Sequence, residues 1–200
     1  YCWSAFGRLM AKRPGSSNVL RLVGGRHRGR KLQFPSARGL RPTADRTRET
    51  LFNWLAPVIN GSVCLDLFAG SGALGFEALS RGARHVTMLE MAMPVFRQLQ
   101  QNADLLGETE HTELLHQSAL SWIEQSTDRQ FDVVFIDPPF KENLLEQVIE
   151  KLIKQNMVKP SGFIYVERDK AQQLPDFPHG YSVIRDKTAG QVAYSLIEYG

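Results

Sequence analysis

The sequence predicts an α/β fold, in which helices cover both faces of a mostly parallel β-sheet. From Ser62 onward, short apolar runs alternate with stretches of helical periodicity, as in repeated βαβ units. The run Val133–Ile136 is apolar without interruption, which is typical of a central strand buried on both faces. Two further strand-like runs, Tyr181–Asp186 and Val192–Tyr199, are too close in sequence for a helical crossover, so we expect an antiparallel hairpin at one edge of the sheet.

The individual elements follow from the same periodicities. The expected parallel strands are Val63–Phe68, His85–Glu90, Glu113–His116, Phe131–Asp137 and Gly162–Glu167. The expected helices between them are Ala73–Ser80, Pro94–Leu106, Ser118–Gln125 and Asn143–Lys154. Ahead of the sheet, we expect a small β-hairpin from Val19–Val23 and Lys31–Phe34. A helix over Arg46–Leu55 should follow, capped by Thr43 or Asp45.

The chain is expected to divide into three parts. Residues 1–17 form a flexible leader, because the segment ends in a loop-forming stretch of Pro, Gly and Ser. Residues 18–45 form a basic segment, made of the N-terminal hairpin and an Arg-Pro-Thr stretch. Residues 46–200 form the α/β domain, and a chain of 200 residues is long enough for one full core.

The charge is divided unevenly along the chain. The net charge is only +3, yet residues 1–50 carry +10 and residues 51–200 carry −7. A basic arm on a mildly acidic domain is typical of nucleic-acid-binding proteins, although a solvated charged tail is the alternative. The candidate RNA-binding residues are Arg26, Arg28, Arg30 and Lys31. No apolar stretch is long enough to span a membrane, so we expect a cytoplasmic protein without a membrane partner, and neither the two cysteines nor the histidines have metal-ligand spacing.

A glycine-rich loop follows the first strand of the expected sheet. Gly70, Gly72 and Gly75 allow the backbone to turn tightly into a helix and to approach a ligand closely. Glu90 ends the second strand, where its carboxylate could accept hydrogen bonds from both hydroxyls of a ribose. The glycine pattern alone also suits NAD or FAD, and an NAD-linked oxidoreductase is an alternative. Asp66 favours S-adenosylmethionine, because a carboxylate would repel a pyrophosphate but suits the donor's amine.

The sequence Asp137-Pro138-Pro139-Phe140 follows the most apolar strand and predicts a site for an amino group. Two prolines remove backbone donors and leave carbonyl groups that can only accept. Asp137 and the Pro138 carbonyl could bind both protons of an amine conjugated to an aromatic base, with its lone pair aimed at a methyl sulfonium. Phe140 could stack on the base. An ordinary Pro-Pro turn is the alternative.

Taken together, these segments resemble the bacterial 16S ribosomal RNA guanine-N2 methyltransferases, which act on guanine 966. The resemblance covers about Val19 to Tyr199. The segments that carry it are Arg26-x-Arg28-Gly29-Arg30-Lys31-Leu32, Leu40-Arg41-Pro42-Thr43-x-Asp45-Arg46, Asp66-x-Phe68-Ala69-Gly70-Ser71-Gly72, Asp137-Pro138-Pro139-Phe140 and Gly190-Gln191-Val192. The glycine loop and the Pro-Pro motif also occur in DNA adenine methyltransferases, so an N6-adenine or other amino methyltransferase is an alternative, as is an RNA-binding module that has lost activity.

The resemblance implies a seven-stranded, Rossmann-like S-adenosylmethionine methyltransferase sheet with a terminal antiparallel hairpin, plus the N-terminal β-hairpin extension. Residues 46–200 would be the methyltransferase domain. The implied catalytic residues are Asp137, Pro138, Pro139 and Phe140. The implied cofactor-binding residues are Arg41, Thr43, Asp66, Phe68, Gly70, Gly72, Glu90, Met91, Ser118 and Ala119. The expected partner is 16S ribosomal RNA in a small-subunit assembly intermediate, and the enzyme is expected to act as a monomer.

Overall fold

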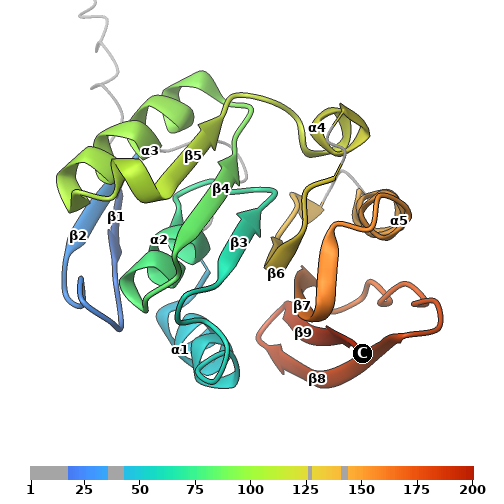
Figure 1. The fold of residues 1–200 in the computed structure, drawn as a ribbon. Helices are drawn as coiled ribbons and strands as arrows, with labels where there is room; N and C mark the ends of the chain where they lie inside the picture. Colours follow the sequence, from blue (N-terminus) through green and yellow to red (C-terminus); the bar gives the residue numbers. More distant parts are fainter. Residues whose placement is uncertain (1–17, 36–42, 126–127, 141–143) are drawn as a thin grey trace, which may run out of the picture.

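The computed structural model describes residues 18–35, 43–125, 128–140 and 144–200. The leader and Arg41 therefore lie outside the described residues. A seven-stranded sheet with the order β5-β4-β3-β6-β7-β9-β8 forms the centre of the molecule (Figure 1). Its strands are β3 (Val63–Asp66), β4 (His85–Leu89), β5 (Thr112–Leu115), β6 (Phe131–Ile136), β7 (Val158–Asp169), β8 (Tyr181–Ala189) and β9 (Val192–Tyr199). The predicted fold class is confirmed.

The first five strands of this sheet are parallel, and the last two complete it as an antiparallel hairpin. β8 continues to Ala189, so the turn of the hairpin contains only Gly190 and Gln191, fewer residues than predicted. Gly190 adopts a φ of 63°, the left-handed conformation that such a tight turn favours. β7 begins four residues before the predicted Gly162, with an irregularity in its pairing with β6.

Helices cover both faces of the sheet, as the alternating pattern predicted. The helices are α1 (Asp45–Trp54), α2 (Ala73–Ser80), α3 (Met93–Leu106), α4 (Ala119–Gln125) and α5 (Leu145–Lys154), with a short 3-10 helix η1 (Thr109–His111) before β5. α1, α2 and α3 pack into one apolar core, whereas α4 and α5 pack into a second core on the opposite face. Within the described residues, no helix is long and apolar enough to cross a membrane.

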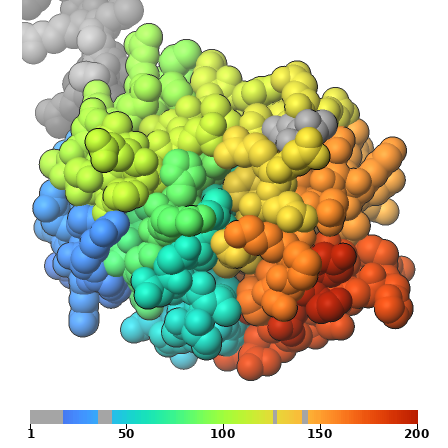
Figure 2. Space-filling view, in the orientation of Figure 1, coloured from blue at the N-terminus to red at the C-terminus, as the bar shows by residue number. Residues whose placement is uncertain are grey.

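The N-terminal hairpin consists of β1 (Asn18–Arg21) and β2 (Lys31–Phe34), paired antiparallel. Its apolar side chains Leu20, Leu22, Leu32 and Phe34 are buried in the same core as α1, α2 and α3. In the space-filling view the hairpin forms a continuous surface with the neighbouring segments (Figure 2). The hairpin is thus packed into the fold, and the division of the chain at residue 45 stays a prediction.

The loop of this hairpin is held against the last turn of α2. The backbone N–H of Arg26 donates to the Ser80 carbonyl at 2.7 Å, and the Ser80 hydroxyl donates to the Gly24 carbonyl at 2.5 Å. Gly25 has a φ of +73°, and a Cβ at this position would lie 1.8 Å from the Ser80 carbonyl oxygen. Glycine at position 25 is therefore required for the close contact between loop and helix.

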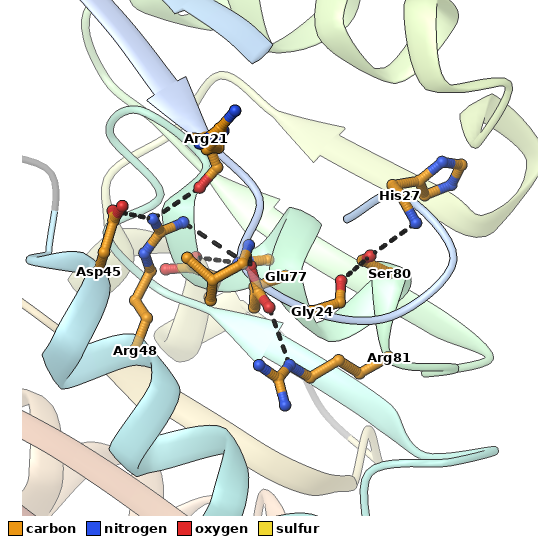
Figure 3. A network of polar contacts seen from close by, with 11 residues as sticks. Arg21, Gly24, His27, Asp45, Arg48, Glu77, Ser80 and Arg81 are labelled. Carbon is orange, nitrogen blue, oxygen red and sulfur yellow. Dashed lines mark hydrogen bonds and ion pairs between the residues drawn. The ribbon is translucent and has the colours of Figure 1, made fainter. Parts of the chain in front are cut away.

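A buried arginine, which sequence reasoning missed, joins the hairpin to α1 and α2 (Figure 3). Arg48 is fully buried, and its Nη2 atom donates to the Arg21 carbonyl at 2.7 Å and to Asp45 at 2.5 Å. Its Nη1 atom lies 3.8 Å from the Glu77 carboxylate, which also accepts hydrogen bonds from Arg81 and from the Val23 N–H. Glu77 thus compensates the charge of the buried guanidinium, whereas the Nε and Nη1 atoms of Arg48 have no hydrogen-bond partner among the described residues.

Candidate active site

The glycine loop connects β3 to α2 at the carboxyl ends of the parallel strands, where open α/β sheets bind ligands. Gly72 is the N-cap of α2 with a φ of 80°, and a Cβ there would lie 2.4 Å from the Phe76 ring. Gly70 adopts a φ of 51°, and its N–H donates to Glu90 at 3.1 Å. The loop therefore depends on glycine at both positions and brings bare backbone to the sheet edge.

Glu90 follows β4 and supports the glycine loop. Its Oε2 atom accepts from the Gly70 N–H, and its Oε1 atom accepts from the Ala92 N–H at 2.6 Å. Each carboxylate oxygen keeps a second lone pair, so the group can still accept hydrogen bonds from a diol. The neighbouring Met91 is 68% exposed and offers an apolar surface beside this carboxylate.

Asp66 ends β3 beneath the loop and is buried. It accepts hydrogen bonds from the backbone N–H groups of Gly75 at 3.2 Å and of Phe68 at 3.4 Å. Burial raises the pKa of its carboxyl to about 7, despite these two hydrogen bonds. A cationic ligand would favour the ionised form, so the site suits a positively charged group.

Ser118 and Ala119 lie after β5, at the start of α4. The Ser118 hydroxyl accepts the Ser121 N–H at 3.2 Å and so caps the helix, while the Ala119 side chain is buried. Their contacts with a cofactor stay a prediction. The Ser118 side chain thus has a structural role at the start of α4, and its own hydroxyl proton is still available to donate.

Asp137 follows β6 beside a second carboxyl group, Glu167, on β7. Ile136 pairs with Val166, so the two acidic residues come next to each other on neighbouring parallel strands. The Tyr165 hydroxyl donates to Glu167 at 2.8 Å. Burial, followed by repulsion from Glu167 and Asp66, raises the pKa of Asp137 well above its usual value.

Thr43 acts on both of these carboxyl groups. Interaction with the Thr43 side chain lowers the pKa of both Asp137 and Glu167, against the larger raising effect of burial. The prediction that Thr43 or Asp45 caps α1 was wrong, because the N-cap residue is Ala44 and no side chain caps the helix. The Thr43 hydroxyl contacts the sheet edge in place of the helix terminus. Burial also raises the pKa of Glu167.

The structure thus gathers most of the predicted site at one edge of the sheet. Pro138 is buried after Asp137, whereas Pro139 and Phe140 are exposed, Phe140 by 40%. Phe140 is free to meet a flat ligand. Sequence reasoning missed Glu167, although a charged residue ending an apolar strand next to the Asp137 strand was a usable signal.

The predicted RNA-binding residues lie at the opposite end of the sheet. Their loop contacts the C-terminal end of α2, whereas the glycine loop meets its N-terminal end; eight helical residues span about 12 Å. Arg26 is paired with the buried Glu108 at 2.6 Å, and Arg30 donates to the Leu105 carbonyl at 2.8 Å. Arg28 and Lys31 are exposed and have no ion pair within the described part of the chain.

Comparison with known proteins shows the family to which the chain belongs. Residues 20–198 match the family described as Conserved hypothetical protein 95. The chain is 47% identical to ribosomal RNA small subunit methyltransferase D of Haemophilus influenzae, over 92% of this chain and 96% of that protein. It is 46% identical to the protein of the same name from Escherichia coli, over 94% of each chain.

Solved structures agree in fold. A putative methyltransferase from Escherichia coli has a TM-score of 0.84 and 43% identity, and the match covers 91% of this chain and 98% of that chain. A putative methyltransferase complexed with SAH has a TM-score of 0.72 at 13% identity, covering 94% of this chain and 57% of that chain, and so shares the fold. The chain therefore belongs to the ribosomal RNA small subunit methyltransferase D family.

Proposed function

We propose that this protein transfers a methyl group from S-adenosylmethionine to the exocyclic N2 amine of guanine 966 in 16S ribosomal RNA. The single observation that carries the proposal is the position of Asp137 and Pro138, which lie at the same sheet edge as the glycine loop. An acceptor pair for an amine and a loop for a methyl donor are thereby brought to one edge. The relatives' printed name supports small-subunit ribosomal RNA as the substrate.

The residues around the glycine loop fit S-adenosylmethionine. Asp66 suits the donor's ammonium group, because a nearby cation favours its ionised form. Glu90 has acceptor capacity left for the ribose hydroxyls. The remaining residues proposed for the pocket are Arg41, Thr43, Phe68, Gly70, Gly72, Met91, Ser118 and Ala119.

Asp137, Pro138 and Phe140 act on the target base by positioning its amine. When bound, S-adenosylmethionine supplies a methyl group that leaves its sulfonium as the new N–C bond forms. An amine attached to a purine is a poor nucleophile, because its lone pair is delocalised into the ring. Asp137 accepts one N–H and the Pro138 carbonyl accepts the other, so the lone pair is held in one direction. Phe140 stacks on the base, and Asp137 is placed to take the proton that the nitrogen loses.

The RNA is bound over a larger surface than the pocket. The target guanine must be unpaired or flipped to reach Asp137, at a cost of a few kcal/mol. Because the hairpin loop lies at the other end of α2, its basic residues Arg26, Arg28, Arg30 and Lys31 would bind the backbone of flanking RNA. The enzyme acts in the cytoplasm, as a monomer, on an assembling small subunit.

Methylation of defined RNA tests the proposal. Ribosomal RNA is isolated from cells lacking the protein, methylated with labelled S-adenosylmethionine, and digested to nucleosides. We expect labelled N2-methylguanosine from position 966. Labelled N6-methyladenosine would contradict the guanine assignment in favour of an adenine methyltransferase, and cofactor binding without labelled RNA would indicate an inactive binding module.

A further inference from the structure

The edge strand β8 carries two exposed cations on one face and an exposed acid on the other. Arg185 lies opposite Leu196 of β9, and Leu196 belongs to the core that contains α1, α2 and α3. Lys187 lies opposite Tyr194 of the same core, so both cations are on the α1 side of the sheet. Asp186 stands between them in sequence and therefore points to the other face.

The charge of this acid is already compensated on its own face. The buried Arg168 donates from its Nη2 atom to Asp186 at 3.2 Å, and the Ser195 hydroxyl donates to the same carboxylate at 2.6 Å. These contacts also join β7, β8 and β9 into one rigid edge. Within the described residues, Arg185 and Lys187 have no ion pair. Their positive charge is therefore available to a ligand.

An aromatic side chain of α1 lies beside these cations. The Nζ atom of Lys187 lies 5.7 Å from the centre of the Trp54 ring. Trp54 is half-buried and stacks on Tyr194, with 5.6 Å between the ring centroids. The contact keeps the ammonium on this face, and its N–H donors can still reach an anion. Cations next to an aromatic ring are typical of surfaces that bind nucleic acid.

This face of β8 is level with the proposed amine site along the strands. Glu167 of β7 lies beside Asp137, because Val166 pairs with Ile136. Glu167 also pairs with Tyr194 of β9, which in turn pairs with Lys187. Three strand spacings separate β6 from β8, or about 14 Å between their backbones. RNA that flanks a base bound at Asp137 can span this separation.

The N-terminal hairpin lies on the other side of β6 (Figure 1). Asn102 of α3 donates to the Gln33 carbonyl of β2 at 2.9 Å, and α3 packs against β5, the opposite edge strand of the sheet. The two basic surfaces are therefore separated by the strand that leads to Asp137. An RNA with its target base at Asp137 has flanking backbone in both directions, and each direction meets one basic surface.

We propose that the face of β8 bearing Arg185 and Lys187 is a second RNA-binding surface, which binds phosphates on the opposite side of the target guanine from those bound by the N-terminal hairpin. This inference rests on the proposed function, which supplies the RNA and the position of its target base. Enzymes that act on an extruded base also contact the nucleotides flanking it. The cations of β8 would make such contacts to the RNA backbone, and so they would add affinity without reading the base sequence.

The test measures binding of a 16S ribosomal RNA fragment at a series of salt concentrations, without methyl transfer. Replacing Arg185 and Lys187 with alanine should make the slope of log affinity against log salt shallower by about 1.4–1.8. The charge-preserving pair Arg185→Lys and Lys187→Arg should keep the slope of the unaltered protein. Alanine at Lys154 and Lys170, exposed lysines outside β8, should also keep it.

RNAs with one uncharged methylphosphonate each locate the contacts. Loss of a contacted phosphate charge weakens binding by the unaltered protein, but not by the variant that lacks the contacting cation. We expect the phosphates that become silent in the Arg185 and Lys187 alanine variant to lie on one side of the target guanine. Those that become silent when Arg28 and Lys31 are replaced with alanine should lie on the other side.

Three results would overturn the inference. These are an unchanged slope in the alanine variant of β8, an equally shallow slope in the charge-preserving variant, and silent phosphates that coincide for the two surfaces. Because binding is measured without catalysis, the two proposals can fail separately. If the unaltered protein does not methylate the RNA but the slope changes as expected, the proposed function fails and the second surface stands. Normal methylation with an unchanged slope means the reverse.

Discussion

Charged side chains are buried in two regions of the molecule. In one region they lie beside groups of opposite charge, and in the other they lie beside groups of the same charge. Between the N-terminal hairpin and α2, Arg48 lies beside Glu77, and Glu108 is paired with Arg26. At the carboxyl edge of the sheet, Asp66, Asp137 and Glu167 face one another, with no compensating cation among the described residues. Paired charges hold elements together, whereas unpaired charges of one sign are costly and suit a site completed by a ligand.

The largest effect is expected in the paired region, from Glu77→Gln. This change removes the buried carboxylate beside the Arg48 guanidinium and leaves the exposed Asp45 as its ionic partner, which should lower the free energy of unfolding by about 3–5 kcal/mol. Urea denaturation measures the change. The matched control is Glu124→Gln, which breaks the exposed pair with Lys151 and should cost about 1 kcal/mol or less. Equal costs for the two variants would remove the distinction between the buried and the exposed pair.

A smaller effect is expected at the sheet edge, from Glu90→Ala. Loss of two charge-assisted hydrogen bonds to the ribose should weaken S-adenosylmethionine binding by roughly 2–4 kcal/mol. The Gly70 N–H in the glycine loop would also lose its hydrogen-bond acceptor. Calorimetry measures the affinity, and Glu110→Ala, an exposed acid on η1, serves as the control for charge. Unchanged affinity in Glu90→Ala would exclude this carboxylate from the pocket.

The smallest effect is expected on the surface of the hairpin. Replacing the exposed Arg28 and Lys31 with alanine should make the slope of log affinity against log salt shallower by about 1.4–1.8, because each phosphate contact contributes about 0.7–0.9. S-adenosylmethionine affinity should not change, since the loop lies at the other end of α2. Alanine at the exposed Lys154 and Lys170 gives the matched control. If neither double variant changes the slope of log affinity against log salt, Arg28 and Lys31 do not contact RNA phosphates.

The two regions were not equally predictable from the sequence. The strand ends that carry Asp66, Glu90 and Asp137 follow from local apolar runs, and parallel topology brings them to one edge. The pairing of Arg48 with Glu77 could not be predicted, because helix periodicity does not reveal partners 29 residues apart on different helices. Three arginines and a lysine in the hairpin predicted RNA binding, whereas Gly25 beside them is explained by the contact with Ser80.

Thr43 shows the same limit within the site. A hydroxyl side chain just before a helix predicts an N-cap. Nothing in the local sequence indicates that Thr43 interacts instead with the carboxyl groups of Asp137 and Glu167. Glu167 was missed because it was interpreted only as the end of the apolar strand formed by the residues before it. The proximity of Glu167 to Asp137 depends on strand register, which places Val166 opposite Ile136.

Asp137→Ala tests most directly whether the carboxyl groups at the ends of β3, β6 and β7 position a target amine. Single-turnover methyl transfer to 16S ribosomal RNA is measured together with S-adenosylmethionine affinity on the same preparation. We predict that the rate falls by about a hundredfold or more, because a preorganised contact to the target amine is lost. Cofactor affinity and the unfolding transition should be retained. A variant that transfers methyl groups at a near-normal rate would contradict the account.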